Sequence, residues 1–326
     1  MTPFITHLRE KAARKSKTIV FPESDDKRIL QAAAYLDEHN ICRVMLVGSE
    51  REVRNTAESH GIRLSGPVLF SEPGKDNEAG KFAKHLFERR KHKGMTEDQA
   101  AAVVQQPLFW AASLVADGEA DGCVSGAANT TGDVLRAALQ VIGLRQGSEV
   151  VSSVFMMSWD DGRVFTFGDC AVVPYPTSAQ LASIAIDSAK THQSLTGEES
   201  RVAMLSFSTK GSAEHERVTL VREALDMVKS KERSLAVDGE LQFDAAYVEA
   251  IGKRKAPGST VAGNANVFIF PNLDAGNISY KITERLGGAT ATGPVIQGLA
   301  KPMNDLSRGC KWEDVVDTAA VCALMS

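Results

Sequence analysis

The sequence predicts an α/β protein in which helices cover largely parallel sheets. Short apolar segments typical of buried strands alternate with longer segments whose apolar residues recur at helical spacing, over almost the whole chain. The 326 residues correspond to roughly two domains at about 150 residues each. Hydrophobic residues make up 43% of the chain, so there is ample material for a sizeable core.

The first half of the chain contains four predicted strands. Residues 18–21 (TIVF) form a buried-strand candidate, and the apolar positions Ile29, Ala33 and Leu36 then recur at helical spacing. The first 15 residues belong to an initial helix. Further strands are expected at 42–47, 68–70 and 121–125, and helices at 25–40, 52–60, 76–118 with breaks near Gly94 and Pro107, and about 131–141.

A β-hairpin marks the start of a second domain near residue 148. Asp161 and Gly162 separate two β-rich segments, and Asp-Gly in that setting is a strong hairpin signal. Beyond Pro176 the alternation of strands and helices resumes. The hairpin strands are 150–159 and 163–170, later strands are expected at 201–208, 234–237 and 266–270, and helices at 212–230, 243–251, 275–286 and from about 312.

Charge and cysteine content exclude several classes of protein. The formal net charge of −4, without a long basic segment, argues against binding to nucleic acid or to an anionic membrane surface. The five cysteines include no CxxC pair, which argues against a disulfide framework and a structural zinc site. No signal peptide and no transmembrane segment is recognisable. We therefore expect free thiols and a cytoplasmic protein.

Common nucleotide, metal and hydrolase motifs are absent from the sequence. It contains no GxGxxG, GxxxxGK[ST], HExxH or GxSxG, and its seven histidines show no metal-ligand spacing. Neither a dinucleotide site nor a metal site is therefore expected.

Two polar segments follow predicted strands, where open α/β sheets bind ligands. The segment 125–131 (SGAANTT) runs from Ser125 into a helix that carries Arg136. Its backbone N–H groups are candidates for holding a phosphate, whereas taken alone it is more simply a capped loop. The segment 207–212 offers hydroxyl groups and Lys210, again with a helix cap as the alternative.

Two further segments stand out by composition. The cluster RRKHKG at 89–94 would attract an anion, although taken alone it is better explained as a solvated helix C-terminus. The segment 293–310 is rich in glycine and proline and lacks periodicity. Loops of this length in compact domains are often functional, so a functional role is favoured there.

Four segments resemble phosphate acetyltransferases (phosphotransacetylases). They are GDCAVVPYPT at 168–177, VDGELQFDAA at 237–246, FPNLDAGNISYK at 270–281 and GPVIQGLAKPMNDLSRGC at 293–310. The resemblance covers essentially the whole chain. The chain is similar to the short, single-module form of the family.

The resemblance implies a reaction and an architecture. The family interconverts acetyl-CoA plus phosphate with acetyl phosphate plus CoA by direct transfer, with no metal and no tightly bound cofactor. The implied fold is two three-layer α/β/α domains similar to isocitrate and isopropylmalate dehydrogenases, with the active site in the cleft between them. Residues 1–147 and 298–326 would form the first domain, and residues 148–297 the second, through which homodimers form.

The family's binding and catalytic positions fall on particular residues of this sequence. Its catalytic serine and arginine fall on Ser307 and Arg308, and its catalytic aspartate falls on Asp314, with Glu313 adjacent. Its anion-binding arginines fall on Arg90, next to Arg89, and on Arg136. The expected substrate-binding set is completed by Ser125, Thr130 and Asn304.

The chemistry of these residues suits acyl transfer. Asp314 is the candidate base for the CoA thiol, but a carboxyl pKa of about 3.9 lies about 4.6 units below a thiol pKa of about 8.5, which corresponds to roughly 6 kcal/mol. Arg308 can bind phosphate through two nitrogens and would lower the thiol pKa. Ser307 is expected to stabilise the oxyanion, while Ser307 or Cys310 as a covalent nucleophile is the less favoured alternative.

Three other functions remain open at this point. A phosphobutyryltransferase would carry out the same reaction with a longer acyl group. A decarboxylating dehydrogenase of similar fold would need metal-binding aspartates and a nucleotide loop, for which no convincing set is found. A binding protein that keeps the fold without turnover is disfavoured by the intact Ser307, Arg308 and Asp314.

Overall fold

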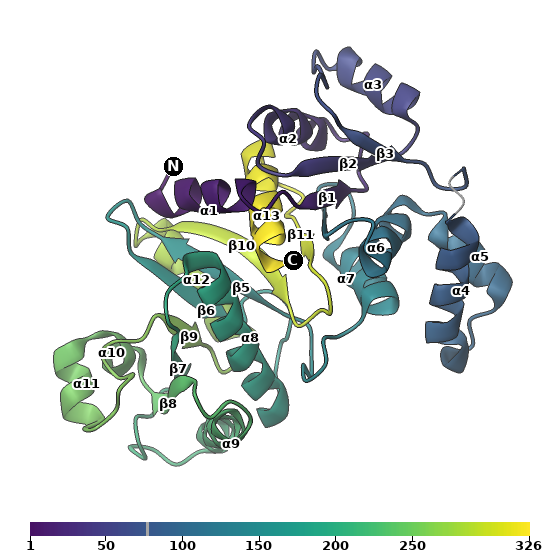
Figure 1. The fold of residues 1–326 in the computed structure, drawn as a ribbon. Coiled ribbons are helices and arrows are strands. Elements are labelled where there is room, and N and C mark those ends of the chain that lie inside the picture. The colour runs from purple at the N-terminus through teal and green to yellow at the C-terminus, as the bar shows by residue number, and fades with distance from the viewer. Residues whose placement is uncertain (76–77) are drawn as a thin grey trace. The chain divides into compact units, whose positions relative to one another are not determined.

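The computed structural model describes residues 1–75 and 78–326, which divide into two compact units (Figure 1). The terminal unit comprises Ile5–Arg145 and Leu299–Ser326, and the central unit comprises Met1–Phe4 and Gln146–Gly298. Among the described residues, none of the helices combines the length and apolar character that crossing a bilayer requires.

The terminal unit is built on a five-stranded sheet in the order β11-β4-β1-β2-β3, and all four strand pairings are parallel. The strands are β1 (Thr18–Phe21), β2 (Arg43–Val47), β3 (Leu69–Ser71), β4 (Gly122–Ser125) and β11 (Met303–Asp305). The helical elements are α1 (Pro3–Ala13, which starts in the central unit), α2 (Lys27–Glu38), α3 (Glu50–Ser59), α4 (Ala79–Arg90), η1 (Lys91–Lys93), α5 (Glu97–Val104), α6 (Pro107–Asp117), α7 (Thr131–Ala137), η2 (Ala138–Ile142) and α13 (Trp312–Met325).

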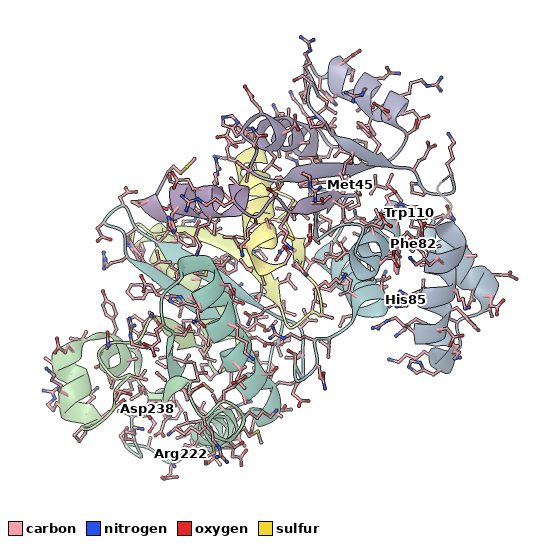
Figure 2. The ribbon with its side chains drawn as sticks, in the orientation of Figure 1. Met45, Phe82, His85, Trp110, Arg222 and Asp238 are labelled. Atoms are coloured by element: carbon pink, nitrogen blue, oxygen red, sulfur yellow. The ribbon has the colours of Figure 1, made fainter. Side chains whose placement is uncertain are left out.

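Burial explains why these strands form. Every residue of β1 and β4 is buried, as expected of parallel strands covered on both faces. Helix α13 packs on β1 and β4, and α6 packs on β1, β2 and β4. The rings of Trp110 on α6 and Phe82 on α4 pack edge to face, with their centroids 5.0 Å apart (Figure 2). Trp110 Nε1 donates to Ser71 Oγ at 2.8 Å.

The central unit contains a six-stranded mixed sheet in the order β10-β5-β6-β9-β7-β8. Strand β5 pairs antiparallel with β6 and β10, and the remaining pairings are parallel. The strands are β5 (Ser152–Ser158), β6 (Val164–Gly168), β7 (Arg201–Leu205), β8 (Ala236–Leu241), β9 (Val267–Ile269) and β10 (Thr290–Gln297), and the helices are α8 (Ser178–Thr196), α9 (Glu216–Lys231), α10 (Phe243–Tyr247), α11 (Glu249–Lys255) and α12 (Leu273–Arg285).

Alternating side chains of β7 divide the core of the central unit into two layers. Val202 and Met204 join a cluster with the apolar residues of α8 and α9. Ala203 and Leu205 join a second cluster with residues of α10 and the aromatic side chain of Phe268. This alternation is the expected pattern for a strand that is covered on both faces.

The structure differs from the sequence-based prediction in several elements. The segment 293–310, expected to be a loop, contains part of β10 and all of β11. Residues 243–251 belong to two short helices rather than one. Helix α8 was not predicted, because it is buried on most of its surface and so lacks a polar stripe. The predicted start of a helix at Asp76 lies outside the described residues.

The amino terminus also departs from the expected domain limits. Met1–Phe4 belong to the central unit rather than to the domain expected for residues 1–147. A hydrogen bond of 3.0 Å between the hydroxyl groups of Thr2 and Ser158, both buried, holds this segment there.

Candidate active site

Ser307 and Arg308 lie on an exposed turn that directly follows β11 in the terminal unit. The amide of Cys310 donates to the carbonyl of Ser307 at 2.8 Å and closes the turn. Ser307 Oγ accepts a weaker bond of 3.3 Å from the amide of Gly309. Within the described part of the chain, the Arg308 guanidinium group makes no hydrogen bond or ion pair and is exposed. This arrangement leaves a cation and a hydroxyl group available at the carboxyl end of the sheet.

Arg28 on α2 fixes this turn by hydrogen bonds to its backbone carbonyl oxygens. Its Nη1 donates to the carbonyl oxygens of Arg308 at 2.7 Å and Cys310 at 3.3 Å, and its Nη2 donates to Ala127 O at 2.6 Å. Asp26 orients the guanidinium group through bonds of 3.0 Å to Nε and 2.7 Å to Nη2. One side chain therefore ties the turn to the loop after β4.

The loop after β4 is already occupied by a carboxylate. Buried Glu23 accepts hydrogen bonds of 2.7–3.2 Å from the amides of residues 126–129 and one of 2.8 Å from Asn129 Nδ2. The sequence predicted that these backbone N–H groups could hold a phosphate. In this structure Glu23 satisfies the amides of residues 126–129 and Thr130 caps the following helix, which agrees with the simpler explanation of the segment as a capped loop.

Arg136 lies on α7, Thr130 lies directly before this helix, and both are exposed. Thr130 is the N-cap, and its Oγ1 accepts from the amide of Asp133 at 3.2 Å. Arg136 makes a 2.8 Å ion pair with Asp133 one turn earlier. An exposed i,i+3 pair of this kind is weak, so it leaves Arg136 able to exchange its partner for a stronger anion.

Arg90 is the last residue of α4 and is half-buried. Its Nε is buried and has no hydrogen-bond partner among the described residues. The adjacent Arg89 instead donates to Gln140 O at 3.2 Å, on η2. Helix α4 thus packs against η2, the segment that follows α7. Among the described residues, no hydrogen bond or ion pair joins Arg90 to Ser307 or Arg308.

Asp314 lies in the first turn of α13 and is exposed. Its Oδ2 accepts a 2.8 Å hydrogen bond from the amide of Lys311, which caps the helix. The adjacent Glu313 has no such bond in the described structure. Asp314 therefore acts as the capping residue of the first turn of α13.

Ser125, Asn304 and Asp305 lie side by side at the carboxyl ends of β4 and β11. Asp305 stands opposite Ser125 in the strand register, and Asn304 stands opposite Val124. All three polar side chains are buried, and Ser125 Oγ has no partner among the described residues. Asp305 Oδ2 accepts a 2.6 Å bond from Thr131 Oγ1.

The pKa of Asp305 is raised to about 6. Burial is the largest cause, and the negative charge of Glu23 acts in the same direction. The hydrogen bond from Thr131 and, to a smaller extent, the nearby backbone amide of Leu306 oppose the shift.

The segment 207–212 in the central unit is closed around two acidic side chains. Lys210 forms an ion pair with Asp238, and Glu240 accepts from the amide of Gly211 at 2.8 Å. Arg222 Nε donates to Glu240 at 2.9 Å and holds the pKa of that carboxyl near 2 against the effect of burial. Figure 2 labels Arg222 and Asp238. The segment is therefore an internally satisfied structural element. It is not the helix cap that the sequence offered as the alternative, because α9 begins at Glu216 with His215 as its N-cap.

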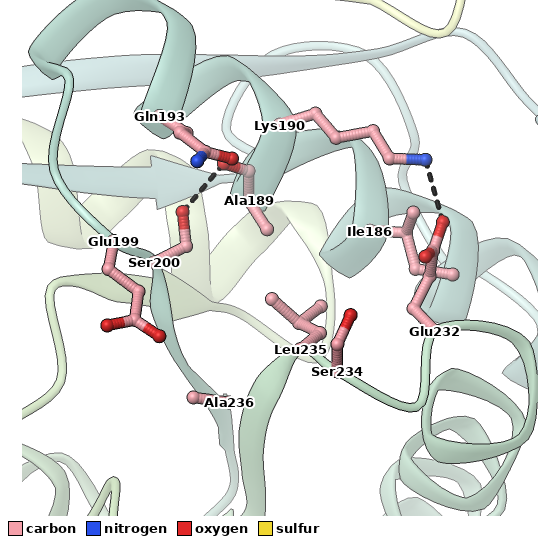
Figure 3. A pocket seen from close by; sticks show the side chains of 10 residues that line it. All are labelled: Ile186, Ala189, Lys190, Gln193, Glu199, Ser200, Glu232, Ser234, Leu235 and Ala236. Atoms are coloured by element: carbon pink, nitrogen blue, oxygen red, sulfur yellow. Dashed lines mark hydrogen bonds and ion pairs between the residues drawn. The ribbon is translucent and has the colours of Figure 1, made fainter.

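A pocket of about 240 Å³ in the central unit lies at the opposite, amino-terminal ends of β7 and β8 (Figure 3). The ion pair between Lys190 and Glu232, 2.8 Å long, lies along one side of it. None of the residues predicted to bind substrate lines this pocket. In the described residues there is also no cluster of His, Cys, Asp and Glu that would suit a metal ion.

Sequence reasoning missed Glu23, Arg28 and Asp305. Glu23 comes two residues after the end of β1, and a charged side chain so soon after a buried parallel strand is a signal that could have identified it, whereas Arg28 lies on α2 and had no such signal. Asp305 was quoted only as part of the GPVIQGLAKPMNDLSRGC segment. Its burial became evident only from the pairing of β11 with β4.

Known proteins match this chain over almost its whole length. The family model described as phosphate acetyl/butaryl transferase matches residues 3–323. Phosphate acetyltransferase of Thermoanaerobacterium thermosaccharolyticum is 45% identical over 327 residues, covering 99% of each chain.

Two solved structures are also similar. A phosphotransacetylase from Streptococcus pyogenes has a TM-score of 0.94 at 40% identity, covering 99% of this chain and 98% of that one. EutD phosphotransacetylase from Staphylococcus aureus has a TM-score of 0.92 at 42% identity, covering 98% and 97%. These matches confirm the resemblance and the fold expected from sequence. The chain belongs to the phosphate acetyl/butaryl transferase family.

Proposed function

We propose that this chain catalyses the reversible transfer of an acetyl group between CoA and inorganic phosphate, with its catalytic groups on the turn after β11. Its full-length relatives are named phosphate acetyltransferases. The observation that carries the assignment of the site is the exposed Arg308 guanidinium group, which lies beside Ser307 on a turn held by Arg28 and makes no ion pair in the described structure.

Arg308 binds the phosphoryl group, and Ser307 stabilises the transition state. The guanidinium group presents paired N–H donors that match two oxygens of a phosphate. When a thiolate attacks the acetyl carbonyl of acetyl phosphate, the carbonyl oxygen becomes negatively charged. The Ser307 hydroxyl group and the amides of the turn are the donors proposed to stabilise this charge.

Asp314 accepts the thiol proton in the direction that consumes acetyl phosphate. The CoA sulfur then forms a bond to the carbonyl carbon, the bond from that carbon to the phosphate oxygen breaks, and inorganic phosphate leaves. In the reverse direction phosphate attacks acetyl-CoA, and the proton returns to the departing thiolate. Because a carboxylate is a weak base toward a thiol, the positive charge of Arg308 is needed to lower the thiol pKa.

Arg90 and Arg136 supply further anion sites for CoA or phosphate. The buried Nε of Arg90, which has no partner among the described residues, supports this role, as does the weak surface pair of Arg136. Ser125, Thr130 and Asn304 remain proposed members of the substrate-binding region. No tightly bound cofactor and no metal are proposed, and CoA enters as a substrate.

The test is arsenolysis of acetyl-CoA in the presence of EDTA, followed by the release of free thiol. Arsenate replaces phosphate, and the acyl product hydrolyses, so the signal is irreversible. Rapid release by the wild type supports a metal-free acyltransferase. No release from folded protein would overturn the proposed function.

The roles of the turn are tested with matched variants. Arg308→Ala is expected to lower kcat/KM by about 10²- to 10³-fold, as removal of a charge-stabilising donor does elsewhere. Arg51→Ala, which removes an exposed arginine on α3, is the control. Asp314→Asn keeps an oxygen for the Lys311 amide and should lower kcat, with Glu313→Gln as its control. A wild-type rate in Arg308→Ala or Asp314→Asn would remove that residue from the site.

The acyl group is proposed to be acetyl. The family description includes butyryl transfer, whereas the curated relatives are named for acetyl transfer. Arsenolysis with acetyl-, propionyl- and butyryl-CoA should show the highest kcat/KM for acetyl-CoA. A higher value for butyryl-CoA would overturn this assignment.

A homodimer in the cytoplasm is proposed as the working state. Helix α12 exposes Ile278, Ile282 and Leu286 at 56%, 53% and 85%, a four-residue spacing that places apolar side chains on one face. Such a face suits contact with a second copy. The free and buried cysteines support a reducing compartment.

A further inference from the structure

Asp305 is a buried carboxyl group that the proposed mechanism does not use. It is 3% exposed, and its Oδ1 is buried without a hydrogen bond among the described residues. The nearby amide of Leu306 is engaged at 2.8 Å with the carbonyl of Ser125. Burying a carboxyl group with one unpartnered oxygen is costly, so Asp305 is expected to lower the stability of the fold rather than add to it.

Its one side-chain hydrogen bond spans two distant parts of the chain. Thr131 Oγ1, which donates to Asp305 Oδ2 at 2.6 Å, lies 174 residues earlier in the sequence. Thr131 is the first residue of α7, the helix that carries Arg136. Asp305 is the last residue of β11 and precedes the turn with Ser307 and Arg308. The bond therefore joins the two segments that carry the proposed anion-binding arginines.

The backbone at this point is shaped for close approach. Gly126 has a φ of +104°, and a Cβ there would collide with the Asp305 carboxyl and lie 2.6 Å from Leu306 N. Only glycine lets the loop after β4 pass this close to the start of the turn. The contact between Asp305 and Thr131 is thus part of a tightly packed junction.

We propose that Asp305 is a positioning residue, whose carboxylate, by accepting the Thr131 hydroxyl, fixes the turn of Ser307 and Arg308 relative to the helix of Arg136. A charged acceptor makes a shorter and stronger hydrogen bond than a neutral one. Protonation weakens that bond and loosens the junction. The inference rests on the proposed function, because it assigns meaning to the placement of those arginines.

The groups around Asp305 set the pH at which its carboxyl ionises. Glu23, in the loop after β1, is the charged group that acts on it, and with burial it raises the pKa of Asp305 to about 6. Asp133 and Arg136 of α7 are paired with each other, and Arg28 of α2 is paired with Asp26. The other ionisable groups on the adjoining elements are Cys123 on β4, Arg308 and Cys310 in the turn, Lys311 at the N-cap of α13, and Glu313, Asp314, Asp317 and Cys322 on α13 itself.

The test compares Asp305→Asn with the wild type by arsenolysis from pH 5 to pH 8. The asparagine still offers an oxygen to Thr131 but stays neutral. Its kcat/KM should fall by about 10- to 100-fold at pH 8, the range of one hydrogen bond to a charged group, and by much less at pH 5. Effects of pH that are common to both proteins cancel in the ratio of their kcat/KM values, so the midpoint of this ratio should lie near pH 6. A ratio that does not change with pH would overturn the proposal.

Two threonine variants provide an independent readout. Thr131→Val keeps the shape and removes the donor, so it should lower kcat/KM at pH 8 as Asp305→Asn does. Thr131→Ser restores the donor and should restore most of the rate. Wild-type activity in Thr131→Val would overturn the proposal. Arg308→Ala separates the two hypotheses: if it is inactive while Asp305→Asn and Thr131→Val are unimpaired, only the positioning role fails.

Discussion

Replacing Asp305 by asparagine should make the protein more stable while making it less active. The carboxyl has an ordinary pKa of 3.8 and a pKa of about 6 in the folded chain. The difference, 6 − 3.8, is about 2.2 units, which corresponds to about 3 kcal/mol of stability lost when the buried group is fully ionised. This is an upper value, because asparagine also gives up the charged acceptor for Thr131.

The sign follows from proton binding. Between pH 3.8 and pH 6 the folded protein holds the Asp305 proton and the unfolded chain releases it, so stability falls as pH rises through this window. Below it the wild type carries no penalty from Asp305, and above it the full penalty applies. Asp305→Asn lacks this dependence. From pH 5 to pH 8 the stability of the variant relative to the wild type should increase by about 1.4 kcal/mol.

The assay is urea unfolding followed by tryptophan fluorescence. Trp110 and Trp312 lie in the terminal unit and Trp159 lies in the central unit. A Trp159→Phe background therefore confines the signal to the unit that contains Asp305. An offset between the two unfolding free energies that is the same at pH 5 and pH 8, or one that shrinks toward pH 8, would refute the reasoning. If Asp305 served only to stabilise the fold, Asp305→Asn would lower stability and activity together.

Two other predictions concern single positions. Burial lowers the pKa of His192 to about 4, so the free energy of unfolding of the central unit should fall by up to about 3 kcal/mol between pH 6.5 and pH 4. In unfolding followed by Trp159 fluorescence, His192→Phe should abolish this pH dependence, and an unchanged dependence would contradict the prediction. In thermal or urea unfolding, Gly126→Ala should lower the free energy of unfolding by about 1–3 kcal/mol more than Gly162→Ala. Both glycines have positive φ, but only the new Cβ at position 126 would clash with Leu306. Equal losses in the two variants would contradict this packing argument.

Local pattern was sufficient for most of the architecture. The alternation of apolar segments predicted β1, β2, β4 and the hairpin of β5 and β6, because these strands are short, apolar and bounded by turn residues. It failed for α8, whose burial on most sides removes the polar stripe that marks a helix. It also failed for β11, a three-residue strand that is recognisable only by its pairing with β4.

The sequence by itself determined the fold class and the segment that carries Ser307 and Arg308, because both depend on residues close together in the chain. Only the tertiary structure showed that Arg28 binds the carbonyl of Arg308, 280 residues away. It also showed that Glu23 occupies the amides that local sequence left free for phosphate. Hydrogen bonds and ionisation depend on what burial brings within about 3 Å, and that is decided by strand pairing and packing rather than by neighbouring residues.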